Sequence, residues 1–400
     1  MRIPGEIEYF LRRLCDSGYE AYLVGGCVRD FLLGETPNDF DVTTSALPEE
    51  TEAVFASDRV VETGLKHGTV TVLHDGVSVE ITTYRTEGAY SDGRHPDSVA
   101  FTRSLVEDLR RRDFTVNAMA MDTEGRIEDP FGGRADLDAR LLRAVGDPVI
   151  RFSEDALRIL RAFRFSAKLG FAVEPQTLQA AFALSPRLGM VSRERIFAEL
   201  DKLLCAPHAA DALLLMADGG VFDCIFANPK LNRRALSYLA SLPRRADSRL
   251  AALLYGDGNA ERHIESLKPS TAFAKRVCGI LCAAPPASPA LPALRRFVYA
   301  NGSEIAHDTA LILANELRGM EELPARLDAL LASEDCFALR DLKVGGDDAR
   351  KAGFCGATIG KALESVLFAV FDGKIDNSHA AETEFLLALG TKAVDSTGKE

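Results

Sequence analysis

The amino-terminal third of the chain alternates short apolar runs with short periodic segments, which predicts strands and helices in turn. The pattern predicts, in order, a strand at residues 21–26, a short helix at 27–34 that Gly34 closes, a strand at 39–44 and a hairpin formed by 68–76 and 77–85. We therefore expect residues 1–145 to form a head in which helices flank a mixed sheet.

From about Pro148 the pattern changes to consecutive helices, with Ala and Leu at spacings of three and four. The runs at 153–170, 192–204 and 209–222 all have this spacing, and Pro-rich residues 282–294 fit a linker. The predicted fold class is therefore α+β, a mixed-sheet head followed by helices. The expected domains are the head at 1–145, a helical neck at 146–225 and a helical body and tail at 226–400.

Length and composition agree with several globular domains. Four hundred residues exceed one ordinary core, and 47% of them are hydrophobic. No apolar run approaches the length of a membrane span, and the first residues contain no signal-peptide core. The eight cysteines are scattered, as in proteins that keep them reduced. We expect a cytoplasmic protein without a membrane partner.

The net charge of −12 argues against a protein that coats nucleic acid indiscriminately. The charge is uneven, however. Residues 151–202 contain nine Lys and Arg against six Asp and Glu, so this stretch is locally basic within an acidic chain. A local groove for RNA thus remains compatible with the composition.

The stretch LVGGCVRDFLLGETPNDFDV (23–42) holds the first candidate chemistry. Residues two apart on a strand face the same side, so Asp39 and Asp41 are expected to project together, which a cation between them would stabilise. Two carboxylates suit Mg²⁺, whose shell phosphates and water complete. Gly25 and Gly26 let a phosphate approach the backbone, and Arg29 adds a guanidinium. This equipment suits phosphoryl or nucleotidyl transfer.

The string GG-x-VRD-x-LLG-x4-DFD resembles the signature of the polymerase-β-like nucleotidyltransferases. The similarity is to the branch that holds bacterial tRNA CCA-adding enzymes and poly(A) polymerases. It continues through residues 82–101, 110–122, 129–171 and 192–204, and thus covers about half of the chain. The resemblance implies Arg112 as a nucleotide ligand and Asp113 as a ribose contact. Glu80 is a candidate third carboxylate, although a surface glutamate on a strand is a comparable interpretation.

Residues 153–165 (SEDALRILRAFRF) predict a helix with Ser153 as its N-cap. Apolar side chains fall on one half of this helix. Four charged side chains fall on the other half: Asp155, Arg158, Arg161 and Arg164. A solvated face with ion pairs is the plain interpretation, but the preceding metal motif favours a face toward a nucleotide.

Cytosine and adenine both present an amino donor beside an unprotonated ring nitrogen, whereas guanine and uracil present the opposite pair. The carboxylate of Asp155 beside the guanidinium of Arg158 complements the first pattern and repels the second. Base choice could then be made without a nucleic-acid template, and the family is understood to use this pair in that way. The resemblance leaves Arg161 and Arg164 for phosphates of the triphosphate or of the RNA.

Residues 248–277 resemble a worn remnant of the histidine–aspartate phosphohydrolase segment that many relatives contain. Tyr255, Gly256 and Asp257 stand where the metal-binding His-Asp pair would be, which predicts no phosphohydrolase activity. The remaining body is expected to support tRNA, although no motif in it identifies an RNA contact.

The resemblance implies template-independent addition or repair of the 3′-terminal CCA of tRNA from CTP and ATP, with Mg²⁺ and release of pyrophosphate. An A-adding enzyme or a poly(A) polymerase is the nearest alternative, and a non-catalytic RNA-binding protein on a retired transferase head is another. The loop YSDGRHP (90–96) argues against an enzyme that adds only CC. The expected partners are the tRNA 3′ end, CTP and ATP, without DNA. Monomer and homodimer both remain open.

Overall fold

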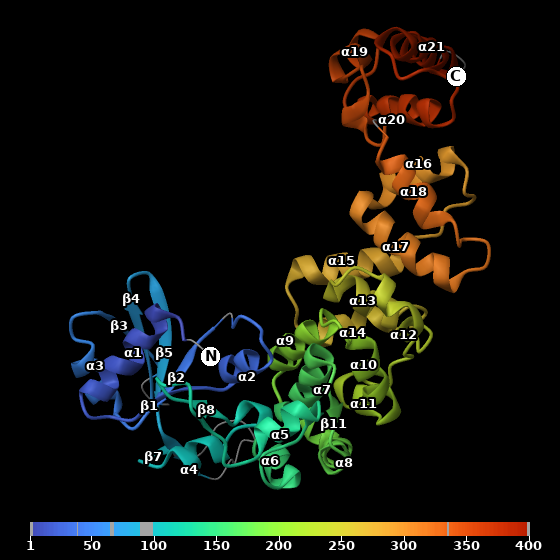
Figure 1. The fold of residues 1–400 in the computed structure, drawn as a ribbon. Helices are drawn as coiled ribbons and strands as arrows, with labels where there is room; N and C mark the ends of the chain where they lie inside the picture. The colour runs from blue at the N-terminus through green and yellow to red at the C-terminus, as the bar shows by residue number, and fades with distance from the viewer. Residues whose placement is uncertain (1–2, 38, 65–67, 89–98, 334–335, 398–400) are drawn as a thin grey trace. The chain divides into compact units, whose positions relative to one another are not determined.

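The computed structural model describes residues 3–37, 39–64, 68–88, 99–333 and 336–397, and the chain divides into two compact units. The first unit comprises Met1–Pro229 with Glu265–Pro269, and the second comprises Lys230–Ile264 with Ser270–Glu400. A sheet with flanking helices occupies the amino-terminal part, and helices follow it (Figure 1). The predicted α+β fold class is confirmed. The boundaries at 145 and 225 remain predictions.

A seven-stranded sheet forms the framework of the first unit, with strand order β3-β4-β5-β2-β1-β8-β9. Its strands are β1 (Ala21–Val24), β2 (Asp41–Thr44), β3 (Arg59–Gly64), β4 (Thr69–His74), β5 (Val77–Thr83), β8 (Ala120–Met121) and β9 (Ile127–Glu128). Strands β2 and β5 pair in parallel, and the other described pairs are antiparallel, so the sheet is mixed as predicted. The central position of β2 brings its first residue next to both β1 and β5.

The predicted hairpin is formed by β4 and β5, and its turn explains the register. Asp75 and Gly76 have φ values of 46° and 81°, which suits a two-residue turn that needs positive φ at both positions. His74 therefore pairs with Val77, and Thr71 pairs with Glu80. The turn thus sets the register of β4 against β5.

One face of the sheet packs on α1 (Gly5–Asp16) and α3 (Pro48–Val54). The apolar side chains of α1 recur at helical spacing and are buried together with Leu23 and Val42 of the sheet. The other face carries a smaller apolar cluster of Val24, Leu109 and Ala120. Because this second face is less covered by apolar residues, it is available for polar side chains.

The remaining elements of residues 1–145 are α2 (Gly26–Leu32), β6 (Arg85–Glu87), β7 (Val99–Phe101), α4 (Leu105–Arg110), η2 (Thr115–Asn117), α5 (Gly133–Asp138) and β10 (Leu141–Leu142).

Helices form most of the remainder of the first unit: α6 (Pro148–Glu154), α7 (Leu157–Leu169), α8 (Pro175–Leu184), η3 (Ser185–Met190), α9 (Arg193–Leu204), α10 (Ala209–Asp218) and α11 (Val221–Ile225). One short strand, β11 (Ala172–Val173), adds to this predicted helical neck and pairs with β10. Helix α7 packs on α9 and α10, which places the start of α9 beside the start of α7.

The prediction that a single helix begins at Ser153 is wrong. Pro148 at the first turn and the Asp147 side chain, which accepts from the Val149 amide, start α6 earlier, and Ser153 lies inside this helix. The chain leaves the helical region at Asp155, and the Asp155 carboxylate accepts from the Leu157 amide at the start of α7. Asp155 is therefore a helix-capping residue at a break between two helices.

In the second unit, all regular elements among the described residues are helices. Its elements are α12 (Ala235–Tyr238), η4 (Leu239–Ser241), α13 (Ala246–Leu253), α14 (Ala260–Ser266, whose last two residues belong to the first unit), α15 (Thr271–Cys282), α16 (Leu291–Asn301), α17 (Ser303–Glu316), α18 (Leu323–Leu331), η5 (Leu339–Asp341), α19 (Gly346–Lys351), α20 (Thr358–Phe371) and α21 (His379–Thr397). One apolar core joins α16, α17 and α18, and another joins α19, α20 and α21. In the worn segment, Asp257 is buried 3.3 Å from His263 and accepts from two backbone amides.

None of the helices in the described ranges combines the length and the apolar character that crossing a membrane requires. All eight cysteines are free thiols, as expected from their scattered positions.

Candidate active site

The turn between β1 and α2 brings three predicted site residues together. Gly25 has φ 81° and ψ −132°, a conformation that favours glycine. A Cβ at Gly25 would lie 3.1 Å from Nη1 of Arg112 and 3.9 Å from Oδ2 of Asp41. The absence of a side chain therefore leaves the backbone open to a ligand between a guanidinium and a carboxylate.

Asp41 is the first residue of β2, and its exact neighbour in the parallel register with β5 is Glu80. This register confirms that Glu80 neighbours the DFD strand. Both side chains are exposed. Partial removal of water raises the pKa of Asp41; Arg112 opposes the rise, and the charges of Glu80 and Asp39 add to it. The three acids thus repel one another, as expected where a cation is to bind.

Asp39 was predicted to lie on a strand, but its backbone lies outside β2. The strand begins at Asp41, so Asp39 precedes it, and the two-residue alternation of a strand does not set the direction of its side chain. Asp41 pairs with Val24, which is the last residue of β1, so the β1 ladder does not extend to Asp39. Asp39 is exposed, and its charge raises the pKa of Asp41. The two carboxylates are therefore neighbours although they do not share a strand.

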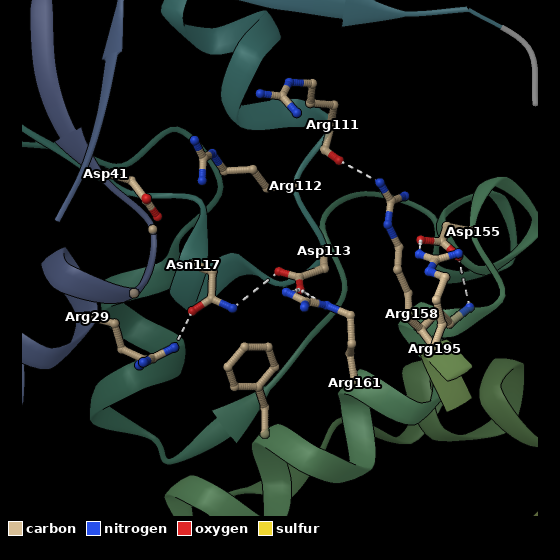
Figure 2. Close-up of a pocket in the computed structure, with 14 residues that line it drawn as sticks. Arg29, Asp41, Arg111, Arg112, Asp113, Asn117, Asp155, Arg158, Arg161 and Arg195 are labelled. Carbon is tan, nitrogen blue, oxygen red and sulfur yellow. Dashed lines mark hydrogen bonds and ion pairs between the residues drawn. The ribbon is translucent and has the colours of Figure 1, made fainter. Parts of the chain in front are cut away.

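A cavity of about 380 Å³ opens beside this turn within the first unit (Figure 2). Its walls are Gly25, Gly26, Arg29, Asp41, Arg111, Arg112, Asp113, Asn117, Asp155, Leu157, Arg158, Arg161, Phe165 and Arg195. Six arginines and three aspartates line it, so the wall has an excess of positive charge. The structure thus brings most of the predicted site residues to one cavity, whereas Asp39, Glu80 and Arg164 are not part of its wall.

Arg112 reaches the cavity beside Asp41 from the segment after α4. Asp108 is fully buried and pairs with Arg111 at 2.8 Å and with Arg112 at 3.5 Å. Although burial alone would raise the pKa of Asp108, these two arginines lower it, so the carboxylate stays ionised and anchors both side chains. Nε of Arg112 is buried without a hydrogen-bond partner in the described residues. Asp108 therefore holds the guanidinium through Nη2, and its Nη1 lies beside Gly25.

Asp113 lies in the middle of the cavity wall and is almost fully buried. It accepts hydrogen bonds from Arg161, from the Asn117 amide and from the Phe114 backbone. Burial would raise its pKa, but the Arg161 guanidinium and the Asn117 amide lower it to about 2. Asp113 therefore fixes Arg161 in the wall; a contact of Asp113 with ribose remains a prediction.

Arg29 is held from two sides and is only 2% exposed. Its Nη1 donates to Oδ1 of Asn117 at 2.5 Å, and its Nε and Nη2 donate to Asp30. Figure 2 shows this chain of contacts running from Arg29 through Asn117 and Asp113 to Arg161. Arg29 therefore forms part of the cavity floor. To bind phosphate as predicted, its guanidinium would have to give up hydrogen bonds to Asn117 or Asp30.

Asp155 and Arg158 lie together at the opposite end of the cavity from Asp41 (Figure 2). The Arg158 backbone amide donates to the backbone oxygen of Asp155 at 3.0 Å, and the two side chains have partners of their own. Arg195 of α9 donates to Asp155 at 2.8 Å, while Arg158 donates to Glu154 at 2.6 Å and to the backbone oxygen of Arg111 at 2.9 Å. Each side chain is thus oriented by its own partners, and both residues line the cavity.

Arg164, predicted as a phosphate ligand, points elsewhere. Its Nε donates to Glu199, a buried carboxylate of α9, and its guanidinium lies over the ring of Phe165 with 3.9 Å to the centroid. The polar half of α7 is therefore not a single stripe facing the cavity. Arg158 and Arg161 face it, whereas Arg164 ties α7 to α9.

Sequence reasoning missed five residues of the cavity wall: Arg111, Asn117, Leu157, Phe165 and Arg195. Two of them had a local signal. Phe165 stands four residues after Arg161, the spacing at which helical side chains touch, and Asn117 follows Asp113 by four. Arg195 gave no such signal, because its partner Asp155 lies forty residues earlier in the chain.

The described residues contain no group of three or more His, Cys, Asp or Glu side chains arranged to hold a metal ion. Two adjacent carboxylates form an incomplete shell, which agrees with an ion that takes further oxygen ligands from water and phosphate. The loop at 89–98, with the predicted YSDGRHP element, and the residues preceding β4 at 65–67 lie outside the described residues.

Two family models match the chain. A model described as the poly A polymerase head domain matches residues 21–143, and one described as a probable RNA- and SrmB-binding site of polymerase A matches residues 170–234. The first match contains the glycine turn, β2 and the Arg112–Asp113 segment. The residues between the two matches contain Asp155, Arg158 and Arg161.

Curated and solved proteins match most of the chain. A CCA-adding enzyme of Streptococcus pneumoniae (strain CGSP14) is 39% identical over 393 residues, which cover 94% of this chain and 95% of the relative. A CCA-adding enzyme of Geobacillus thermodenitrificans (strain NG80-2) is 52% identical over 211 residues, covering 53% of this chain and 52% of the relative. The crystal structure of a Bacillus stearothermophilus CCA-adding enzyme in complex with CTP superposes with a TM-score of 0.79, 35% identity and 98% coverage of both chains.

Proposed function

The chain belongs to the family of CCA-adding enzymes, and we propose that it performs their reaction in the cavity between the β1–α2 turn and helix α7. Its activity is that of a tRNA nucleotidyltransferase, the template-independent addition of the 3′-terminal CCA from CTP and ATP. The observation that carries the assignment of the site is that one cavity joins Asp41 and the glycine turn to Asp155 and Arg158. One end is suited to phosphate chemistry, and the other is suited to a base.

The charge of the cavity wall supports a nucleoside triphosphate as its occupant. Arginines outnumber aspartates there by six to three, and guanidinium groups bind phosphate oxygens with paired hydrogen bonds. Arg112 is the strongest candidate for this contact, because it is anchored by Asp108 beside Gly25 and has a donor without a partner in the described residues. Arg161 is the next, with one edge fixed by Asp113.

Mg²⁺ is the proposed cofactor, held by Asp39 and Asp41 with Glu80 as the candidate third carboxylate. The exposed carboxylates of Asp39 and Asp41 are the oxygen ligands that this ion prefers, and burial together with the charges of Glu80 and Asp39 raises the pKa of Asp41. When bound, a divalent ion would activate the attacking 3′-oxygen and stabilise the leaving pyrophosphate. The chain's own contribution is to place these acids at the start of β2, next to the glycine turn that admits the phosphates.

The base is proposed to be read by Asp155 and Arg158. The carboxylate can accept from the amino group of cytosine or adenine, and the guanidinium can donate to the adjacent ring nitrogen. Arg195 and Glu154 support this interpretation, because each orients one member of the pair and both members line the cavity. Uracil and guanine would place a carbonyl against Asp155 and an N–H against Arg158, and both contacts would be repulsive.

The predicted domains follow from the same proposal: a nucleotidyltransferase head at 1–145, a base-recognising neck at 146–225, and a body and tail at 226–400 that support the tRNA. A cytoplasmic location is expected from the tRNA substrate. The worn segment at 248–277 is expected to lack phosphohydrolase activity, because Asp257 is already engaged by backbone amides and lies beside His263.

The direct test is to incubate the purified protein with tRNA that lacks CCA, with tRNA ending in CC and with complete tRNA, each with one nucleotide at a time. The first should accept two cytidines from CTP, the second one adenosine from ATP, and the third nothing. Adenosine added only to tRNA ending in CC would instead identify an A-adding enzyme. Long tails from ATP would identify a poly(A) polymerase, and tRNA binding without any addition would identify a retired transferase.

A further inference from the structure

Phe165 of α7 is a side chain of the cavity wall whose surroundings are unusual for a phenylalanine. Three guanidinium groups lie near its ring: Arg164 at 3.9 Å from the centroid, Arg161 at 5.3 Å and Arg29 at 5.4 Å. Two of these arginines come from α7 itself, and the third comes from α2 in the head. The ring is only 6% exposed, so these contacts occur with little water around them.

A continuous chain of polar contacts runs beside the ring. Arg29 donates to Asn117, Asn117 donates to Asp113, and Arg161 donates to Asp113. Arg161 lies 3.7 Å from Glu199, and Glu199 accepts from Arg164, which lies over the ring. Residues from α2, η2, α7 and α9 thus meet around one aromatic side chain.

Three guanidinium groups lie close together around this buried side chain, and each is paired with a carboxylate: Arg29 with Asp30, Arg161 with Asp113 and Arg164 with Glu199. The guanidinium groups nevertheless repel one another across the ring. The face of an aromatic ring carries negative potential and attracts cations within about 6 Å, most strongly where water is excluded. An aliphatic side chain of similar volume would fill the same space without this attraction. The ring therefore stabilises an arrangement of guanidiniums that apolar packing alone would not favour.

We infer that Phe165 is a positioning residue for nucleotide binding: its ring holds the guanidinium groups of Arg29 and Arg161 in place in the cavity wall. This inference rests on the proposed function of the cavity. It adds that cavity-wall arginines of the head and of α7 depend on one shared aromatic ring. Arg164 takes part as the link from the ring to Glu199 rather than as a phosphate ligand.

The test replaces Phe165 by phenylalanines with increasing numbers of ring fluorines, up to pentafluorophenylalanine. Fluorine withdraws electron density and weakens the negative face stepwise while the ring keeps nearly the same shape. The Kd for CTP, measured by titration calorimetry with Mg²⁺ and without tRNA, should rise with each step and reach about tenfold at five fluorines. Phe165→Leu should raise the Kd at least as much, whereas Phe165→Tyr should change it by less than about twofold.

Phe163 is the matched control on the same helix. It is fully buried and stacks on Phe182 at 6.3 Å, and it makes no cation–π contact among the described residues. The same fluorinated residues at position 163 should leave the Kd for CTP unchanged, and thermal unfolding should show equal stability for the matched pairs. A Kd that does not respond to fluorination at 165, or responds equally at 163, would overturn the inference. A wild-type protein that binds CTP but adds nothing to tRNA would contradict the proposed function and leave this readout intact.

Discussion

The acids of the proposed metal site in the head and the charged residues of the neck are in opposite conditions. The head offers Asp39, Asp41 and Glu80, which are exposed and have no ion-pair partner in the described ranges. In the neck, Arg158, Arg161 and Arg164 are each paired with a carboxylate, and Asp155 is paired with Arg195. The head is therefore left to be completed by a ligand, whereas the neck is already organised.

Net charge shows the same contrast. Residues 1–145 contain 27 Asp and Glu against 16 Lys and Arg, whereas residues 146–225 contain 10 against 9. Unpaired acids in an acidic head suit a site that recruits cations, and paired charges in a nearly neutral neck suit a site that must keep its shape. Changes in the head should therefore alter the rate for every nucleotide, and changes in the neck should alter which nucleotide is chosen.

The largest effect is expected from the head. Asp41→Ala or Asp39→Ala would remove a proposed metal ligand, and nucleotide addition should fall by more than about a hundredfold for CTP and ATP alike. Binding of tRNA should survive, because no change is made in the basic stretch at 151–202. The measurement is single-turnover addition together with a tRNA-binding titration. Addition at a rate near that of the wild type by either variant would refute the assignment of the site.

The next effect is expected from the neck. Arg158→Ala would remove a charge-assisted donor to the base, so the preference for CTP over UTP and for ATP over GTP should fall roughly ten- to a hundredfold. Competition assays with pairs of nucleotides measure this ratio. Arg112→Ala is the counterpart in the head, and it should slow all four nucleotides without changing their ratio. If Arg158→Ala lowers the rate and leaves the CTP-to-UTP ratio unchanged, then Arg158 contacts phosphate or RNA instead.

The third effect concerns the contact that joins the two regions. Asp113 in the head accepts from Arg161 in the neck, and its pKa is lowered from 3.8 to about 2. A depressed folded-state pKa contributes stability above the unfolded-state value and loses it as the pH falls through the folded-state value. The window of this loss therefore lies between about pH 4 and pH 2.

Asp113→Asn should lower the free energy of unfolding by about 2 kcal/mol at pH 7 and by roughly half as much at pH 3. Urea unfolding of both proteins at the two pH values is the measurement. A difference between the proteins that stays constant from pH 7 to pH 3 would show that the carboxylate charge contributes nothing and that the change is one of packing.

Local signals predicted the head well. The hairpin and the glycine turn follow from short stretches in which backbone requirements are visible, such as Asp75–Gly76 and Gly25. Asp41 and Arg112 were found because the residues around them form a recognisable string. Asp39 was placed on the strand because alternation was extended two residues too far, beyond the point where the β2 ladder begins.

Long-range contacts limited the prediction of the neck. Ser153 was chosen as a cap from its local sequence, but Asp147 and Pro148 start the helix first, and the break then falls at Asp155. The direction of Arg164 depends on Glu199, thirty-five residues later, and the orientation of Asp155 depends on Arg195. Such pairs form when one helix packs on another, and residue spacing along a single helix does not reveal them.

The smallest effect tests whether the neck is organised in advance by these long-range pairs. Arg195 orients Asp155 through a partly exposed ion pair, with 24% and 16% of the two side chains exposed. Such a pair contributes about 1 kcal/mol, so Arg195→Ala should weaken discrimination of CTP from UTP about fivefold, in the same direction as Arg158→Ala but less. Arg193→Ala is the matched control two residues earlier, because Arg193 donates to the backbone oxygen of Ile225 and is not part of the cavity wall. It should leave the ratio unchanged. Equal ratios for the wild type and Arg195→Ala would mean that Asp155 keeps its direction through its cap on Leu157 alone, and the break between α6 and α7 would then be sufficient to organise base recognition.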